Sequence, residues 1–387
     1  MTAPSQRTDR TRPTVMNATM TANKVLFRPT RFPVLAQTVA APRSPGGSVY
    51  VTDPAWIPTR YDARNDSLTF ARVPAETRKQ VVFLEERFLG HAQQSPPISV
   101  ARLLNADIDT GPAHFIFHTA FCCSTLMTRA LDLPSVAAGL KEPGVLISFA
   151  EHWSNARQTP GALNALNITL DLLSRPTAPG ETQIIKATNA ANHLLPEILH
   201  LRPDAKVLVM YSGLDAFLES VTRRDFGGRS FARQMHQTFT DAIPLDISFT
   251  QQEQMLHTDT QIAALVWLMQ TAFFAQIQRY YGADRVRTLS SARFLAAPAN
   301  ALANAGAFFE LDASPEQWAE VADGPVFREH AKERGRPFTT ATHNAQLAHA
   351  RNAHTRELQV TEDWAQQIAA RCGAPLSLGD TLMSPDT

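Results

Sequence analysis

The chain has 387 residues, enough for one large domain with appendages or for two domains. Its 36 basic and 36 acidic residues cancel, and 44% of its residues are hydrophobic, a fraction typical of a globular protein. The charge balance argues against a general affinity for nucleic acid or anionic membranes, because such binding needs uncompensated Lys and Arg. A local basic pocket is compatible with the same balance.

The three cysteines, Cys122, Cys123 and Cys372, are too few and odd in number for a disulfide framework. We therefore expect a reducing, cytoplasmic location. No run approaches the roughly 18 apolar residues that a membrane span needs. The N-terminal stretch is basic and Thr-rich but lacks the apolar core of a secretory signal.

Composition divides the chain into four parts. Residues 1–24 are predicted to be a disordered tail. Residues 25–95 are predicted to form an extended arm, anchored by Phe and Trp, and a helix over 76–90, both packing on the core. Residues 96–375 form the predicted α/β domain, and residues 376–387 a flexible C-terminus. We find no internal repeats.

Short apolar runs alternate with helical patterns through the centre of the chain. Strands are predicted over 113–119, 182–188, 205–212 and 284–290. Helices are predicted over 124–133, 163–175, 192–202, 214–225, 258–282, 292–311 (broken near Pro298) and 361–373. Continuous apolar strands between helices favour an α/β fold with a parallel central sheet flanked by helices in three α/β/α layers.

The loop after the first core strand, HTAFCCST (118–125), is a candidate anion site. Ligands of open parallel sheets bind at the C-terminal ends of strands, and unpaired backbone N–H groups where a helix begins attract anions. Ser124 and Thr125 can cap the helix or donate hydroxyls to a phosphate. An ordinary strand–helix turn is the alternative. The loop is not a Walker A motif, because it lacks the Gly-Lys pair.

The adjacent Cys122 and Cys123 allow three interpretations. Vicinal cysteines are poorly placed to chelate one metal ion. A thiol where a helix begins can be reactive. The favoured interpretation is that both are small residues that let the loop pass close to a ligand or pack under the sheet.

In order and separation, four segments between about 113 and 340 resemble sulfotransferase-like proteins of the P-loop NTPase-like fold, near the bacterial and tyrosylprotein sulfotransferases. FIFHTAFCCSTLM resembles the family's 5′-phosphosulfate loop, G-x-P-R-S-G-T-T-L-L. Ser124, Thr125 and Leu126 match its T-T-L. Phe121 stands where the family has Arg, and Cys123 where it has Gly, so the loop lacks the usual cation.

Two further segments carry the catalytic candidates that the resemblance implies. Glu142, in LKEPGVL (140–146), falls where related enzymes place a general base. Lys186 ends the strand IIKAT, where it could neutralise the oxygen of the leaving group. His118, beside the loop, is a second candidate for proton transfer. A surface Glu before a Pro turn and a structural His are the alternatives.

The 3′-phosphate motif is only partly retained. Ser220 matches the family's Ser, whereas Ser212 stands where Arg is usual. Arg223 and Arg224 follow Ser220 within a turn and could supply the missing charge, although a solvated helix end is the alternative.

The fourth match covers 283–318, and a basic segment follows it. That segment, GPVFREHAKERGRPFTT (324–340), contains Lys332, Arg334 and Arg336, which would close over the nucleotide. A solvated basic loop is the alternative.

The resemblance implies transfer of a sulfuryl group from 3′-phosphoadenosine 5′-phosphosulfate (PAPS) to a hydroxyl or amine, with no metal. The co-substrate would contact Phe121, Cys122, Cys123, Ser124, Thr125, Ser212, Ser220, Arg224, Lys332 and Arg334. The acceptor would be a small molecule or peptide, held by loops within 25–75 and 226–258. His343, His349 and His354 lack the spacing of a metal site.

Two other functions are compatible with the departures from the family. One is a kinase-like or other nucleotide-dependent transferase of the P-loop fold. The other is a catalytically inactive binding or scaffold protein, which the substitutions at Phe121, Cys123 and Ser212 would permit. Nothing in the sequence indicates a nucleic-acid partner or an oligomeric state.

Overall fold

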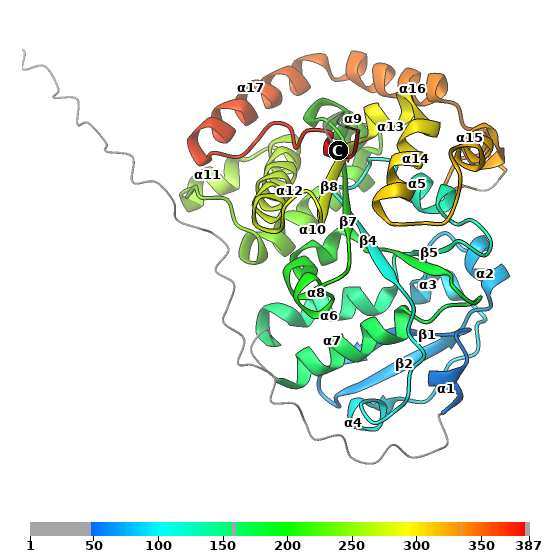
Figure 1. The fold of residues 1–387 in the computed structure, drawn as a ribbon. Helices are drawn as coiled ribbons and strands as arrows, with labels where there is room; N and C mark the ends of the chain where they lie inside the picture. Colours follow the sequence, from blue (N-terminus) through cyan, green and yellow to red (C-terminus); the bar gives the residue numbers. More distant parts are fainter. Residues whose placement is uncertain (1–47, 157–159, 334, 384–387) are drawn as a thin grey trace, which may run out of the picture.

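The computed structural model describes residues 48–156, 160–333 and 335–383. Its central sheet is parallel and has five strands: β4 (Ala113–His118), β5 (Ala137–Lys141), β6 (Thr182–Lys186), β7 (Val207–Tyr211) and β8 (Val286–Ser290) (Figure 1). Every residue of β6 and β7 is buried, which explains their continuously apolar sequences.

The strand order is β5-β6-β4-β7-β8. After β4 the chain runs to the sheet edge at β5, returns through β6, and then crosses β4 to β7 and β8. The direction of the connections thus reverses beside β4. In open α/β sheets ligands bind at such a reversal, outside the carboxyl ends of the strands.

Helices cover both faces of the sheet, which confirms the three-layer α/β/α prediction. On one face, Phe115, Phe117 and Ile185 pack in the same core cluster as α6 (Gly144–Ala156), α7 (Pro160–Leu173), the 3-10 helix η1 (Asn189–Leu194) and α8 (Leu195–Leu201). On the other face, Ile116 and Leu208 pack with α5 (Ser124–Ala130), α13 (Ser291–Ala296), α14 (Pro298–Phe308) and α15 (Pro315–Asp323). The alternation of Phe115, Ile116 and Phe117 between the two clusters follows from the two-residue period of a strand.

A third core cluster is made mainly of helices. It joins α9 (Leu214–Thr222), α10 (Asp225–Ala242), α12 (Asp259–Tyr281) and α17 (Thr355–Cys372). Two more helices, α11 (Gln251–Leu256) and α16 (Thr340–Ala353), lie beside them, and α16 packs on α9 (Figure 1). α12 is long and apolar enough to cross a membrane, but 78% of its most apolar window is buried inside the structure, as in a core helix.

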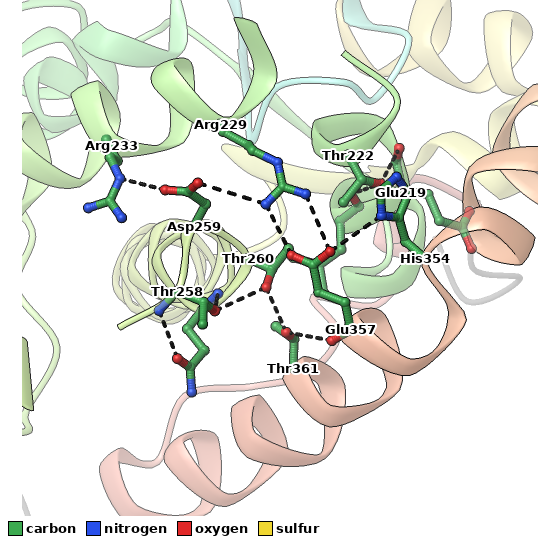
Figure 2. A network of polar contacts seen from close by, with 12 residues as sticks. Glu219, Thr222, Arg229, Arg233, Thr258, Asp259, Thr260, His354, Glu357 and Thr361 are labelled. Atoms are coloured by element: carbon green, nitrogen blue, oxygen red, sulfur yellow. Dashed lines mark hydrogen bonds and ion pairs between the residues drawn. The ribbon is translucent and has the colours of Figure 1, made fainter. Parts of the chain in front are cut away.

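Polar contacts fix α17 on α10 and α12 (Figure 2). Arg229 of α10 pairs with Glu357 of α17 through two N–O contacts of 3.0 and 3.3 Å. The Thr361 hydroxyl of α17 donates to that of Thr260 on α12 at 2.9 Å. This network also holds α10 in place beside α9.

The predicted strands and helices of the centre are confirmed, whereas several flanking predictions are wrong. Residues 56–72 are not an extended arm: β1 (Trp56–Asp62) and β2 (Ser67–Arg72) pair antiparallel, with β3 (Ile98–Ser99) beside β2. Residues 376–383 are not free, since Leu382 is fully buried and the 3-10 helix η3 (Thr381–Met383) lies on β8. The predicted tail at 1–24 lies outside the described residues.

The predicted helix over 76–90 is interrupted. It consists of α2 (Ala75–Gln80) and α3 (Glu86–Leu89), with an extended stretch between them. In that stretch the Leu84 N–H donates to the Lys141 carbonyl at 2.8 Å, and the Gly144 N–H donates to the Leu84 carbonyl at 2.9 Å. This tertiary pairing outweighs helix propensity and draws the stretch to the end of β5.

The remaining short elements are α1 (Val49–Thr52), α4 (Val100–Leu103) and the 3-10 helix η2 (Pro325–Phe327). The segment 226–258, predicted to be a loop, is mostly helical because it contains α10 and α11.

Gly227 and Gly228 are adjacent in α10, but only Gly228 lies close to the backbone of α9. A Cβ on Gly228 would lie 2.0 Å from the Val221 carbonyl oxygen, whereas a Cβ on Gly227 would have no neighbour within 4 Å. We expect Gly228→Ala to lower the free energy of unfolding by about 1–3 kcal/mol through overpacking. Gly227→Ala should be neutral or stabilising by up to about 1 kcal/mol, because Ala is the better helix former. Urea unfolding measures both, and equal effects of the two variants would contradict this packing.

Candidate functional site

A cavity of about 580 Å³ opens at the carboxyl ends of β4 and β5. Most residues proposed from the sequence line it: His118, Phe121, Cys122, Cys123, Ser124, Thr125, Glu142, Ser220, Arg223, Arg224 and Lys332. The cavity therefore brings together residues from the first core strand to the late basic segment, as the order of the motifs predicted.

The loop between β4 and α5 has a backbone that usually requires glycine. Ala120, Phe121 and Cys123 have φ angles of 71°, 53° and 61°. Within the described residues, the backbone N–H groups of Phe121, Cys123 and Thr125 donate to no acceptor. Non-glycine residues in this conformation are uncommon and concentrate at functional sites. The loop thus has several backbone donors without an acceptor in the described structure, although it contains no glycine.

Phe121, at the position where the resemblance predicted a lost arginine, points into an aromatic cluster. Its ring centroid lies 5.5 Å from that of Phe217 on α9 and 5.2 Å from that of Phe231 on α10. The guanidinium of Arg224 stacks 4.3 Å from the Phe121 centroid. A cation therefore lies beside Phe121, but it comes from the end of α9.

His118 ends β4 and is held in one tautomer. Its Nδ1 accepts a hydrogen bond from the Ala120 N–H at 3.0 Å, so in the neutral ring the proton is on Nε2. Nε2 lies 3.9 Å from Oε1 of Glu142 and has no hydrogen-bond partner among the described residues. Burial, with the charges of Lys186 and Lys332, lowers the His118 pKa well below its usual value. His118 is thus placed as a neutral N–H donor rather than as a base.

Glu142 and Lys186 form a buried ion pair at the ends of neighbouring strands. The Lys186 ammonium contacts Oε1 of Glu142, and the Glu142 N–H donates to the Lys186 carbonyl at 2.8 Å. Lys186 is fully buried, whereas Glu142 also lines the cavity. Glu142, directly after β5, has a φ of 51°. Lys186 thus contacts Glu142 and does not itself line the cavity, whereas Glu142 does.

The hydroxyl candidates divide into two groups. Ser124, Thr125 and Ser220 line the cavity, and Oγ1 of Thr125 is buried without a hydrogen-bond partner in the described part of the chain. Ser212, directly after β7, is fully buried and does not line the cavity, and its carbonyl accepts from the Trp267 indole at 2.9 Å. The structure thus does not place Ser212 with the other proposed ligands.

Three cations line the cavity without a carboxylate partner among the described residues: Arg223, Arg224 and Lys332. Arg223 bonds to the Gln346 amide oxygen, and Arg224 donates to the Ser220 carbonyl at 2.7 Å. Burial lowers the Arg224 pKa to about 10, which leaves it charged at neutral pH.

Arg336, another basic candidate of the late segment, does not line the cavity. Arg336 pairs with Glu333 at 2.6 Å on the exposed side of the segment. Arg334 lies outside the described residues.

The cysteine environment bears on the reactive-thiol interpretation. Burial raises the pKa of Cys122, and it raises that of Cys123 to about 12. The Cys122 thiol contacts the Met210 carbonyl under the sheet at 3.3 Å. Both thiols are therefore protonated at neutral pH. Among the described residues, no group of three or more His, Cys, Asp or Glu could hold a metal ion.

Several lining residues were not selected from the sequence. The stretch between α2 and α3 contributes Phe83 and Glu85, and Arg87 follows. Glu85 pairs with Arg87 at 2.8 Å, and burial raises the Glu85 pKa. These residues reach the cavity because Leu84 forms backbone hydrogen bonds with Lys141 and Gly144. A contact between distant parts of the chain leaves no local sequence motif. The segment 226–258 was expected near an acceptor, and its helix α10 does line the cavity through Phe231, Gln234 and Met235.

Comparisons with known proteins give limited similarity. No protein-family model matches the chain, and no curated protein shows significant similarity to it. The solved structures similar to it include the sulfotransferase domain of the Synechococcus PCC 7002 olefin synthase, at 14% identity and a TM-score of 0.38, covering 66% of this chain and 95% of that one.

Two more similar structures are sulfotransferases. The sulfotransferase domain of the curacin biosynthetic pathway matches at 13% identity and a TM-score of 0.39, covering 70% of this chain and 100% of that one. The Alicyclobacillus acidocaldarius sulfotransferase matches at 13% identity and a TM-score of 0.32, covering 60% and 99%. Likeness at this level carries no argument about activity, so the function proposed below rests on the cavity itself.

The cysteine environment predicts slow thiol chemistry. With a pKa of about 12 in place of the usual 9.0, Cys123 should alkylate with iodoacetamide at pH 8 on the order of a thousandfold more slowly than an unperturbed thiol. Peptide mass spectrometry of timed reactions measures the rate. The same protein in urea, where burial is lost, should label at the ordinary rate. Rapid labelling of the folded protein would instead support a reactive cysteine.

Proposed function

We propose that this chain is a sulfotransferase that moves a sulfuryl group from PAPS to a hydroxyl or amine. The observation that carries the proposal is the pairing of Glu142 with Lys186 at a cavity lined by three cations that have no carboxylate partner among the described residues. The cavity thus combines a paired carboxylate, suited to accept a proton, with an excess of positive charge, suited to a multiply charged anion.

The cavity residues fit the anionic co-substrate. Oγ1 of Thr125 is a buried donor without a hydrogen-bond partner in the described structure, and such a group is costly unless a ligand or water satisfies it. The open N–H groups of the loop add further donors for a 5′-phosphosulfate. Ser220, with Arg223 and Arg224 one turn away, would hold the 3′-phosphate.

In the proposed reaction Glu142 accepts the proton of the acceptor while the acceptor attacks sulfur. The new bond to sulfur forms as the bond between sulfur and the bridging phosphate oxygen breaks, and the electron pair stays on that oxygen. Lys186 orients the Glu142 carboxylate. The Nε2–H of His118 can donate to an oxygen that gains charge. These steps use no metal ion.

Donor binding is the first test. Calorimetry should show binding of adenosine 3′,5′-bisphosphate by the full chain. Ser220→Ala should weaken it by about 10- to 100-fold, the range for a lost hydrogen bond to a charged group. Ser212→Ala is the matched control and should leave affinity unchanged, because Ser212 does not line the cavity. A folded chain that does not bind this nucleotide would overturn the proposal, and binding of ATP with Mg²⁺ instead would favour a kinase-like transferase.

The role of Glu142 is tested separately. Glu142→Gln keeps the side-chain shape and a hydrogen bond to Lys186 but removes the base, so turnover should fall by about 10²–10⁴-fold. Turnover is followed by mass spectrometry as sulfonate gain on metabolites or peptides incubated with enzyme and donor. Affinity for adenosine 3′,5′-bisphosphate should stay within a few-fold of wild type, which also shows that the variant is folded. Undiminished turnover would reject the assignment.

A further inference from the structure

The phosphosulfate loop supplies no cation of its own. Phe121 stands where the resemblance predicts an arginine, and its ring is packed against Phe217 and Phe231. Lys186 cannot fill the gap, because it is fully buried and paired with Glu142. A sulfonate bound at this loop would therefore meet backbone donors and hydroxyls, but no positive charge from β4, β6 or α5.

Lys332 approaches the loop from a segment about 200 residues further along the chain. Its ammonium lies 5.3 Å from the centroid of the Phe83 ring, and the Lys186 ammonium lies 5.4 Å from the same centroid. Lys332 lines the cavity, and burial lowers the pKa of its ammonium. It interacts electrostatically with groups on every side of the loop: His118, Cys122, Cys123, Glu142, Lys186 and Arg224.

The segment that carries Lys332 is a closed turn anchored to α5. The His330 N–H donates to the Arg336 carbonyl at 2.7 Å, which closes the turn around Lys332. Arg129, in the last turn of α5, pairs with Glu329 at 3.2 Å and donates to the His330 carbonyl at 3.4 Å. The helix that follows the loop therefore fixes the position of the turn.

We propose that Lys332 is a catalytic residue that replaces the missing loop cation and contacts the non-bridging oxygens of the transferred sulfonate. The inference rests on the proposed function, since it assigns the sulfonate end of the same co-substrate. The Lys332 charge stabilises the sulfonate during its transfer between oxygens, and no proton moves to or from Lys332. Arg129 is a positioning residue that holds the turn.

The test compares two ligands that differ at the sulfonate. Calorimetry is run with PAPS and with adenosine 3′,5′-bisphosphate, which lacks the sulfonate, on the full chain. Lys332→Gln should weaken PAPS binding by about 10- to 100-fold and leave binding of the bisphosphate within about twofold. Lys332→Arg keeps the charge and should restore most of the PAPS affinity. Arg224→Gln is the contrasting variant and should weaken both ligands alike.

Arg129→Ala checks the positioning role. It should reproduce the selective loss of PAPS affinity in weaker form, with bisphosphate binding retained as proof of folding. Equal weakening of both ligands by Lys332→Gln would place Lys332 at a nucleotide phosphate and overturn the inference. An unchanged PAPS affinity would also overturn it. A wild-type chain that binds neither ligand would instead defeat the proposed function.

Discussion

The buried charge of Lys186 constrains the whole candidate site. A fully buried ammonium needs a carboxylate close by, because an unpaired charge in the protein interior costs several kcal/mol. Glu142, directly after the neighbouring strand β5, meets that need. The stretch around Leu84 then covers the pair by bonding to Lys141 and Gly144. The wall of the cavity that contains Phe83, Glu85 and Glu142 is thus built around this ion pair.

The opposite wall has a different origin. The end of α9, with Ser220, Arg223 and Arg224, is held by α10 and by α16, whose Gln346 bonds to Arg223. Close packing at Gly228 and the polar network that fixes α17 make this helical part a firm support. Arg223 and Arg224 have no carboxylate partner among the described residues, so the two walls differ in chemistry: one carries a paired carboxylate, and the other carries cations that are bonded only to neutral groups. A charged donor and a proton-losing acceptor would meet between them.

Sequence reasoning was strongest where the physics is local or periodic. Apolar runs marked β4, β6, β7 and β8, and helical spacing marked α12, because burial on both faces selects apolar residues throughout. Prediction from the sequence failed where contacts between distant residues determine the local structure. The three examples are the β1–β2 hairpin, the interruption at Leu84, and α10. For the site, the order of motifs led to Glu142 and Ser220. It also selected Ser212, which the structure buries away from the cavity. Phe83 and Glu85 had no local signal, since only the folded chain brings them to the end of β5.

The late turn that bears Lys332 has a consequence for biosynthesis. The eight strands in the described part of the chain all lie before Ser291, so the last quarter of the chain is synthesised after them. Lys332 reaches the loop at His118 only after more than 200 further residues have been synthesised. A prematurely terminated chain would thus contain the complete sheet and the Glu142–Lys186 pair but none of the charge that Lys332 brings.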